Sequence, residues 1–441
     1  MSPVVALPRS DAPTCGERSR TTRRRVRRPA AALALLLAAS RIAAADPVPR
    51  LDPERLRPIA DHAAAAVATR HVPGVVVVAG VGDRVAFTGA WGNKQLRPAP
   101  IAMTADTIFD MASCTKVVGT TTAIMLLVDD GRLSVEDPVS RWIPGFTGGG
   151  REAVRIRDLL THTSGVVEYT GSDELVRRSG YGGDPDALLQ KICSLPLAYA
   201  TGRGWRYSCL NMILAARCAE HAAGRSLHEF LTTRVFGPLG MKDTGYRLTA
   251  DQIRRTAPTG RVVTGSDGYL DAAGALVPPW NGGGPFVKRI VHDHLACFYQ
   301  NADHCGGNAG LFSSGPDLAI FLRMILNRGS FHGVRVIKPE TVDLFTRRQS
   351  PAGVTAWCFG WGLLGGFPWT PDPDAPPDRR AIGHSGYTGT YVWIDKSAGL
   401  WAAILTNRVH ADDSDASKRA VVDLRRKILD TLVKACDAYN P

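Results

Sequence analysis

Strand patterns stand at both ends of this chain of 441 residues, and helical patterns fill the middle. Near the start, the apolar run VVVVAGV over 75–81 is followed by Gly82-Asp83 and then by RVAFTGAWG over 84–92, which predicts a β-hairpin. Further strand patterns, including YVWIDKS and WAAILTN, lie between residues 379 and 407. Antiparallel strands that come from both ends of a chain favour one shared sheet, with the middle of the chain packed as a separate lobe.

Helical patterns complete this prediction of the fold. Residues 53–70, 113–129 and 415–436 have the apolar spacing of helices, and residues 150–350 combine helical segments with loops rich in Gly and Pro. We therefore predict an α+β fold, in which an antiparallel sheet built from both chain ends is flanked by the terminal helices. A mainly helical lobe is inserted mid-chain.

The expected domain covers residues 46–441. Its α/β lobe comprises about 50–115 and 355–441, and its helical lobe comprises about 116–354. A cleft between two lobes is where a small-molecule site is expected.

Residues 1–45 contain the segments of a secretory signal peptide in their usual order. Arginines between Arg23 and Arg28 precede a short apolar stretch over 30–40, and Ala43-Ala44-Ala45 offers a small-residue cleavage site. The apolar stretch is too short to span a bilayer, and no later segment is long and apolar enough for a membrane helix. The sequence therefore predicts an exported protein, periplasmic or secreted, with no integral membrane segment in the mature chain.

The net charge of +12 does not indicate a nucleic-acid partner. Residues 1–45 contain nine arginines and two acidic residues, a net charge of +7, so the rest of the chain carries only +5. A nucleic-acid-binding domain needs a basic patch in its folded part, and no basic run follows residue 45. We therefore expect no nucleic-acid partner.

Eight of the nine cysteines follow the signal segment, and in an exported protein some are expected to pair. Cys297 and Cys305 are close in sequence and form the first candidate pair. Metal binding is the alternative, because His292, His294 and His304 lie nearby, but their spacing matches no zinc pattern. We therefore expect no metal and no other cofactor.

Ser113 and Lys116 form a Ser-x-x-Lys at the start of the expected helix over 113–129. The offset of three places both side chains on one helix face. A charge-tuned Lys draws the proton from a nearby Ser hydroxyl, and the N–H groups at a helix N-terminus suit an oxyanion. By itself this spacing is common by chance, so its meaning depends on the motifs that accompany it.

Two further motifs suit the same chemistry. Tyr207 in WRYSCLN can shuttle a proton if nearby cations lower its pKa. His384, in GHSGYTGTYVWID, ends a late strand in small residues, which lets a substrate lie alongside it. The N–H of Tyr387 is then the candidate second oxyanion donor beside the N–H of Ser113. Each motif alone also has a structural interpretation, as a helix-start Tyr or a loop His.

Together the motifs, in the order Ser-x-x-Lys, Tyr-Ser and His-x-Gly, resemble the serine β-lactamase and penicillin-binding-protein superfamily. The resemblance extends from about residue 53 to 410 and is closest to the branch with class C β-lactamases, DD-peptidases and related esterases. It includes TADTIFDMASCTK, DGRLSVEDPVSRWIP, IRDLLTHTSG, FGPLGMKDTGY, NAGLFSSGPDLAIF and GHSGYTGTYVWID.

This resemblance implies an exported serine hydrolase that acts on an ester or amide through an acyl-enzyme. Ser113 becomes the nucleophile, Lys116 its activator and Tyr207 the general base or acid. His384 takes the place of Lys in the Lys-Thr-Gly form of the third motif, which argues against a dedicated β-lactamase. The residues implied to bind substrate are His384, Ser385, Gly386, Tyr387 and Asn211.

The second motif departs from the family pattern at Cys209, where relatives have a polar residue that holds the substrate amide and the Lys. A Cys side chain holds neither the substrate amide nor the Lys well. Asn211, one helical turn from Tyr207, is expected to take over this role. Ester hydrolysis is less affected by this change than amide hydrolysis. The expected substrate is a small molecule or a peptidoglycan-derived peptide. The alternative is a catalytically weak protein that binds penicillin or peptidoglycan.

Overall fold

The computed structural model describes residues 49–96, 99–170, 185–261, 286–287, 291–293, 295–296, 304–351, 354, 357–364, 381–410 and 413–437. The expected signal peptide over 1–45, together with His294 and Cys297, lies outside these residues. Within them, no helix is both long enough and apolar enough to cross a membrane.

The strands and helices have the following bounds. The strands are β1 (Gly74–Val81), β2 (Arg84–Gln95), β3 (Ile101–Ala102), β4 (Ile108–Asp110), β5 (Gly260–Arg261), β6 (Phe286–Val287), β7 (Phe312–Ser314), β8 (Ser330–Phe331), β9 (Val334–Arg335), β10 (Gly362–Leu364), β11 (Ala381–Ser385), β12 (Tyr391–Asp395) and β13 (Leu400–Thr406). The α-helices are α1 (Pro53–Leu56), α2 (Pro58–Ala68), α3 (Thr122–Asp129), α4 (Val139–Trp142), α5 (Ile156–Leu160), α7 (Pro185–Ser194), α8 (Cys209–Ala223), α9 (Leu227–Leu231), α10 (Gly237–Leu239), α11 (Ala250–Arg255), α14 (Gly315–Leu326), α15 (Pro339–Phe345) and α16 (Asp415–Ala435). Shorter 3₁₀ or π segments are η1 (Ala112–Cys114), η2 (Lys116–Thr121), η3 (Arg151–Ala153), η4 (Thr232–Phe236) and η5 (Arg408–His410).

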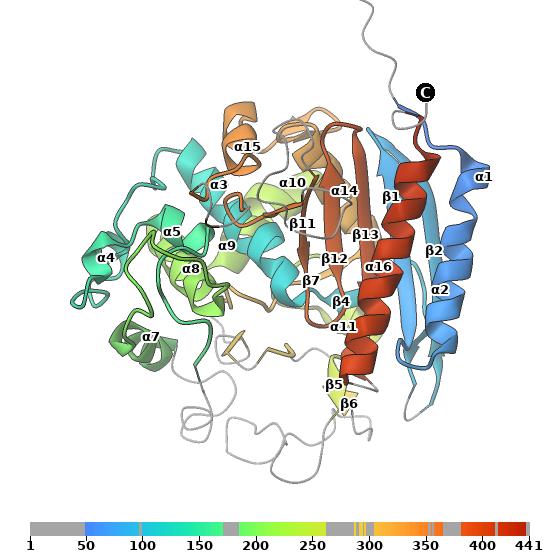
Figure 1. The fold of residues 1–441 in the computed structure, drawn as a ribbon, viewed down its shortest axis with the longest axis horizontal. Helices are drawn as coiled ribbons and strands as arrows, with labels where there is room; N and C mark the ends of the chain where they lie inside the picture. Colours follow the sequence, from blue (N-terminus) through green and yellow to red (C-terminus); the bar gives the residue numbers. More distant parts are fainter. Residues whose placement is uncertain are drawn as a thin grey trace, which may run out of the picture. The chain divides into compact units, whose positions relative to one another are not determined.

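The main sheet has seven antiparallel strands in the order β10-β11-β12-β13-β1-β2-β3 (Figure 1). It joins strands from the beginning and the end of the chain, and the helices between them form the helical lobe. The α+β fold class expected from the sequence is therefore confirmed. Smaller two-stranded sheets are β4-β7, β5-β6 and β8-β9.

Strand β1 lies inside this sheet and is buried on both faces, which explains its continuous apolar sequence. Val75 and Val77 belong to the core beneath the terminal helices, whereas Val76 and Val78 belong to the core of the helical lobe. Side chains of successive strand residues point to opposite faces, so one strand of valines contributes to both cores. Val77 lies opposite Ile404 in β13, which joins the two ends of the chain.

Helices α1, α2 and α16 pack on one face of the sheet (Figure 1). The helix expected over 53–70 is interrupted, because Pro58 has no N–H to donate inside a helix and instead begins α2. The last helix follows the prediction closely. Its buried positions include Val421, Leu424, Ile428 and Leu432.

The helix expected over 113–129 is not regular. A 3₁₀ turn (η1) carries Ser113, a π-helical segment (η2) starts at Lys116, and only α3 is an ordinary α-helix. The Thr122 hydroxyl donates to the carbonyl oxygen of Val117, at 2.9 Å, across the widened turn. Single π-turns inside helices are frequent at functional sites, and hydrophobic periodicity does not reveal them.

The prediction that Cys305 pairs with Cys297 is not supported. Cys305 has a free thiol that is buried beside the core of the helical lobe, rather than placed in an exposed loop. Cys297 lies outside the described residues.

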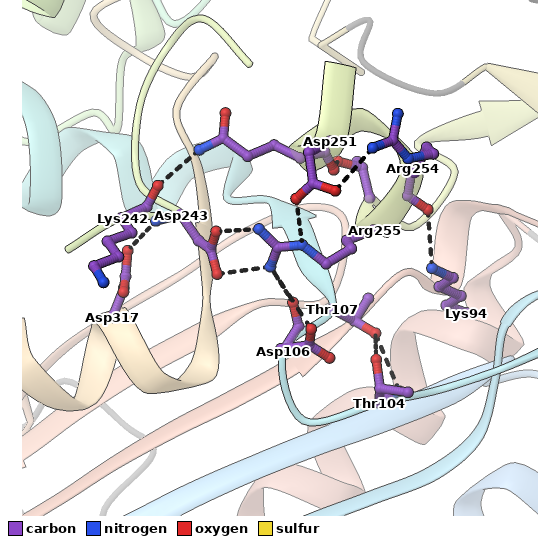
Figure 2. Close-up of polar contacts among 12 residues, drawn as sticks. Lys94, Thr104, Asp106, Thr107, Lys242, Asp243, Asp251, Arg254, Arg255 and Asp317 are labelled. Atoms are coloured by element: carbon purple, nitrogen blue, oxygen red, sulfur yellow. Dashed lines mark hydrogen bonds and ion pairs between the residues drawn. The ribbon is translucent and has the colours of Figure 1, made fainter. Parts of the chain in front are cut away.

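Arg255 links α11 to two other segments through a network of polar contacts (Figure 2). Its guanidinium donates to the Asp243 carboxylate, with one distance of 2.8 Å, and to a carboxylate oxygen of Asp251 at 3.3 Å. It also donates to the carbonyl oxygen of Asp106, just before β4, while Lys94 in β2 donates to the carbonyl oxygen of Arg254. This network fastens the helical lobe to the edge of the main sheet.

We predict that Arg255→Ala lowers the free energy of unfolding by roughly 1–2 kcal/mol, because it leaves the mostly buried Asp243 carboxylate without its partner. The control is Arg254→Ala. Arg254 pairs with Asp251 at the surface, so its loss should cost less than about 0.5 kcal/mol. Urea unfolding of both variants measures the difference. Equal losses would contradict this role of Arg255.

Candidate active site

Ser113 lies on a tight turn that β4 and β7 hold in place. The turn requires Ala112 to adopt a positive φ of 44°, which is unfavourable for a residue with a side chain. The Asp110 carboxylate stabilises this conformation by accepting the N–H of Ala112 at 2.8 Å. Its other oxygen accepts the N–H of His292 at 2.7 Å. Burial raises the pKa of Asp110 to about 6.

Gly386 lets the end of β11 approach this turn closely. A Cβ atom at Gly386 would lie 2.5 Å from the carbonyl oxygen of Met111 and 2.1 Å from the Thr390 hydroxyl oxygen. The Thr390 hydroxyl donates to the same Met111 carbonyl at 2.9 Å, so the two segments are also hydrogen-bonded. The small residue that the sequence places after His384 is therefore required by the contact between the third motif and the Ser113 turn.

Lys116 is completely buried, and its ammonium group contacts residues of several segments. The Nζ atom donates to the Ser113 Oγ at 2.9 Å and to the carbonyl oxygen of Asn308 at 2.9 Å. The third partner is the Cys209 Sγ, at 3.6 Å. Tyr207 is a further hydrogen-bond partner of this group, so a charged Lys here has partners enough for its three hydrogens.

The side chains around Lys116 favour its protonated form. Burial by itself lowers the pKa of Lys116, but Cys209 and Tyr207 act in the opposite direction, and the pKa is raised above its ordinary value. Burial also raises the pKa of Tyr207, although Lys116 opposes this shift. Both groups therefore carry their protons at neutral pH.

Tyr207 is positioned by the residues at the start of α8. The Ser208 hydroxyl caps this helix by accepting the N–H of Asn211 at 3.1 Å. The N–H of Ser208 donates to the Nδ1 of His162 at 3.2 Å, and the His162 ring lies 4.7 Å from the Tyr207 ring. Trp357 contacts the same group, with its ring 6.2 Å from that of Tyr207. His162 is therefore part of the scaffold, and its ring packs against Tyr207.

Asn211 does not take the place that the sequence suggested. Its Oδ1 accepts the Ser164 hydroxyl at 2.7 Å, its amide lies 3.4 Å from the His162 ring, and the residue is buried. A position one turn further along α8 points into the scaffold rather than toward Ser113. Cys209 itself contacts Lys116, so the second motif keeps its contact to the Lys through sulfur.

His384 is buried in β11 and neutral. Its Nδ1 lies 2.9 Å from the carbonyl oxygen of Ser385, and because a carbonyl only accepts, Nδ1 carries the hydrogen. The Nε2 atom is then an acceptor, and it has no partner among the described residues. Burial and, secondarily, the Lys116 charge lower the pKa of His384 to about 3.

A cavity of about 460 Å³ brings the three motifs together. It combines the turn at Ser113, the start of α8 and the end of β11 with the aromatic side chain of Trp357, which lies outside the motifs. Its lining residues are Ser113, Tyr207, Trp357, Gly362, Gly383, His384, Ser385, Gly386, Tyr387 and Tyr391.

Two contributors to this site were not predicted as site residues from the sequence. Asn308 acts through its backbone carbonyl, which leaves no trace in residue type, while its amide donates to Asp293 at 2.9 Å. Trp357 reaches the cavity because its backbone bridges to Gly362 beside β11. Only the register of the sheet could have placed it there.

A search of the described residues finds no group of three or more His, Cys, Asp or Glu placed to hold a metal ion. Two of the histidines considered for such a site have other neighbours. His292 stacks on Tyr387, with ring centres 5.2 Å apart, and His304 accepts from Arg217 at 2.6 Å.

Comparisons with known proteins identify the family and the fold of this chain. The family model described as Beta-lactamase matches residues 59–427. The "N-acetylmuramyl-L-alanine amidase" of Bacillus subtilis (strain 168) is 31% identical over 356 residues, which are 77% of this chain and 78% of the relative. A penicillin-binding protein homologue from Caulobacter crescentus has a TM-score of 0.64 at 20% identity, covering 88% of this chain and 100% of that chain. A class C β-lactamase has a TM-score of 0.64 at 19% identity, covering 86% of this chain and 96% of that chain.

The chain belongs to the Beta-lactamase family. The resemblance inferred from the sequence motifs is confirmed, and the family places the protein among serine hydrolases. The two structural likenesses support the same fold.

We predict that Cys209→Ser acylates within about threefold of the wild type, whereas Cys209→Val is slower by about tenfold, because the buried Lys116 ammonium loses a polar partner. Stopped-flow acylation by an activated ester measures both rates. Cys193→Val, in α7 and outside the cavity lining, is the control and should not change the rate. A valine variant at Cys209 that acylates at the wild-type rate would exclude a role for the sulfur contact.

Proposed function

We propose that this protein is an exported hydrolase that cleaves an ester or amide through an acyl-enzyme on Ser113. The observation that carries the proposal is the 2.9 Å contact between the Lys116 Nζ and the Ser113 Oγ, where Ser113 and Tyr207 line the same cavity. A Ser hydroxyl becomes a useful nucleophile only when a neighbouring base takes its proton. His384 lies in the same cavity, but no carboxylate contact of its ring is seen among the described residues, so a Ser-His-Asp arrangement is not the basis of the proposal.

In the proposed reaction, the Ser113 Oγ attacks the substrate carbonyl carbon, and its proton passes to the Tyr207–Lys116 pair. The oxyanion is stabilised by the N–H groups of Ser113 and Tyr387. The leaving group then departs with that proton, and a water molecule hydrolyses the acyl-enzyme by the reverse path. Since both Lys116 and Tyr207 carry protons at neutral pH, one proton must leave the pair before it can act as the base.

Two observations support the proposed location of the protein and its substrate class. The sequence of residues 1–45 is typical of a signal peptide and favours export to the periplasm or medium. The relative from Bacillus subtilis is named for cleavage of an amide between an N-acetylmuramyl group and L-alanine. A small ester or amide, including a peptidoglycan-derived one, is therefore the proposed substrate class.

A catalytically weak binding protein is the second candidate, and Cys209 is the observation that favours it. A thiol is a poorer hydrogen-bond partner than the polar side chain that the family motif usually carries there. Such a protein would form the acyl-enzyme and then hydrolyse it slowly. The two candidates therefore differ in deacylation, not in the identity of the nucleophile.

We predict that a fluorophosphonate probe labels Ser113, because this is the hydroxyl that Lys116 contacts. Intact mass and peptide mapping locate the adduct, and Ser113→Ala is the control that should remain unlabelled. An adduct on Cys114, or anywhere else while Ser113 stays free, would overturn the proposed function.

We predict that Lys116→Ala and Tyr207→Phe each lower the acylation rate by at least about 100-fold, since removing a positioned base costs on the order of 10²–10⁴-fold. The double variant should be little worse than the poorer single variant, because the two groups act as one unit. His384→Ala should mainly raise KM or change the preferred substrate. Stopped-flow acylation measures all four proteins. Loss of acylation in His384→Ala with a near-normal Lys116→Ala would favour a Ser-His mechanism instead.

A further inference from the structure

The backbone carbonyl of Asn308, which accepts the Lys116 Nζ at 2.9 Å, belongs to a loop with little rigidity of its own. Gly306 and Gly307 come directly before Asn308, and glycine restricts the backbone less than any other residue. The Thr120 hydroxyl donates to the carbonyl oxygen of Gly307 at 2.7 Å, which fixes the peptide group before Asn308. The peptide group after Asn308, whose carbonyl faces Lys116, needs a further support.

The side chain of Asn308 supplies that support through Asp293. The Asn308 Nδ2 donates to the Asp293 Oδ1 at 2.9 Å, and the residue is completely buried. Because a carboxylate only accepts, the amide nitrogen is the atom that faces Asp293. The same side chain is a hydrogen-bond neighbour of the Cys209 thiol. Asn308 therefore contacts Asp293 with its side chain and Lys116 with its backbone.

Asp293 is itself held in place by its own segment. Its Oδ1 also accepts the N–H of Ala296 at 2.8 Å. The N–H of the preceding residue, His292, donates to the Asp110 carboxylate at 2.7 Å, and this carboxylate stabilises the turn at Ser113. One short segment therefore supports both the turn that carries the Ser113 hydroxyl and the loop that faces its activating Lys.

Asp293 does not act on a substrate directly. It is partly buried, and neither it nor Asn308 is among the residues that line the cavity. Its effect must pass through Asn308 to Lys116. Hydrogen bonds weaken steeply when donor and acceptor are misaligned, so a rotated Asn308 carbonyl would release one hydrogen of the buried ammonium group. The Lys116 Nζ would then no longer be held at the Ser113 Oγ.

We propose that Asp293 is a positioning residue for acyl transfer: by holding the Asn308 amide, it directs the Asn308 carbonyl toward Lys116. This role needs an acceptor oxygen at position 293 rather than a negative charge. The inference rests on the proposed function, because it concerns the Lys that activates Ser113.

Two alanine variants test the inference by removing the two ends of one hydrogen bond. Asp293→Ala removes the acceptor, and Asn308→Ala removes the donor but keeps the backbone carbonyl. We expect each to lower the maximum acylation rate by about tenfold, the effect of losing a well-placed hydrogen bond to a charged group. The half-saturating concentration of an activated ester should stay within about twofold, because neither side chain lines the cavity. Stopped-flow acylation measures both quantities.

The double variant Asp293→Ala/Asn308→Ala shows whether the two residues act together. If they act through their shared hydrogen bond, it should be no slower than the slower single variant. Losses that multiply in the double variant would show that the residues act separately and would overturn the inference.

A conservative variant and a matched control complete the experiment. Asp293→Asn keeps an acceptor oxygen without the charge and should acylate within about threefold of the wild type. Asp83→Ala removes the same kind of hydrogen bond, from the Asn327 amide to an Asp carboxylate, at the turn between β1 and β2. Asp83 is exposed and outside the cavity lining, so this variant should acylate at the wild-type rate.

An Asp293→Ala variant that acylates at the wild-type rate would overturn the inference, and so would an Asp293→Asn variant as slow as Asp293→Ala. Urea unfolding shows whether the variants are folded. If Asp293→Ala is not, Asn308→Ala and Asp293→Asn decide by the same criteria. When the fluorophosphonate probe labels Ser113 in the wild type, any of these failures refutes only the role of Asp293. If Ser113 of the wild type stays unlabelled, the proposed function fails, and the inference fails with it.

Discussion

The buried ammonium group of Lys116 is the constraint on which the rest of this structure depends. Taking such a charge out of water costs several kcal/mol unless it is fully hydrogen-bonded. The structure meets this requirement with partners that include Ser113, Cys209 and the carbonyl of Asn308, which come from three separate segments. The turn at Ser113, the start of α8 and the loop before β7 must therefore take up their positions together. The same alignment brings the three sequence motifs into one cavity.

Much of the fold could be predicted because its main elements have strong local patterns. The valines of β1 indicated a buried strand, and the apolar spacing over 415–436 indicated the helix that became α16. The irregular backbone around Ser113 could not be predicted, because the positive φ of Ala112 depends on the carboxylate of Asp110 and on packing with β7. Local propensity would assign that segment to an ordinary helix.

The candidate site, like the fold, could be predicted from the sequence only in part. Ser113, Lys116, Tyr207 and His384 could be selected from the sequence by motif order and spacing. Ser113, Tyr207 and His384 line one cavity, and the buried Lys116 contacts Ser113. The prediction for Asn211 failed because helical spacing alone does not say which face of α8 is turned to Lys116. The Asn308 carbonyl and Trp357 depend on tertiary contacts that sequence spacing does not encode.

The proposed mechanism makes a definite claim about charge, which the pH dependence of acylation tests most directly. Because the pKa values of Lys116 and Tyr207 are both raised, the active deprotonated form of the pair should increase about tenfold per pH unit through neutrality. The pKa of His384, at about 3, lies too low to contribute there. We therefore expect kcat/KM for an uncharged ester to rise continuously from about pH 6 to beyond about pH 8. A plateau reached near pH 7, governed by a group that titrates like an ordinary histidine and is lost in His384→Ala, would contradict the account.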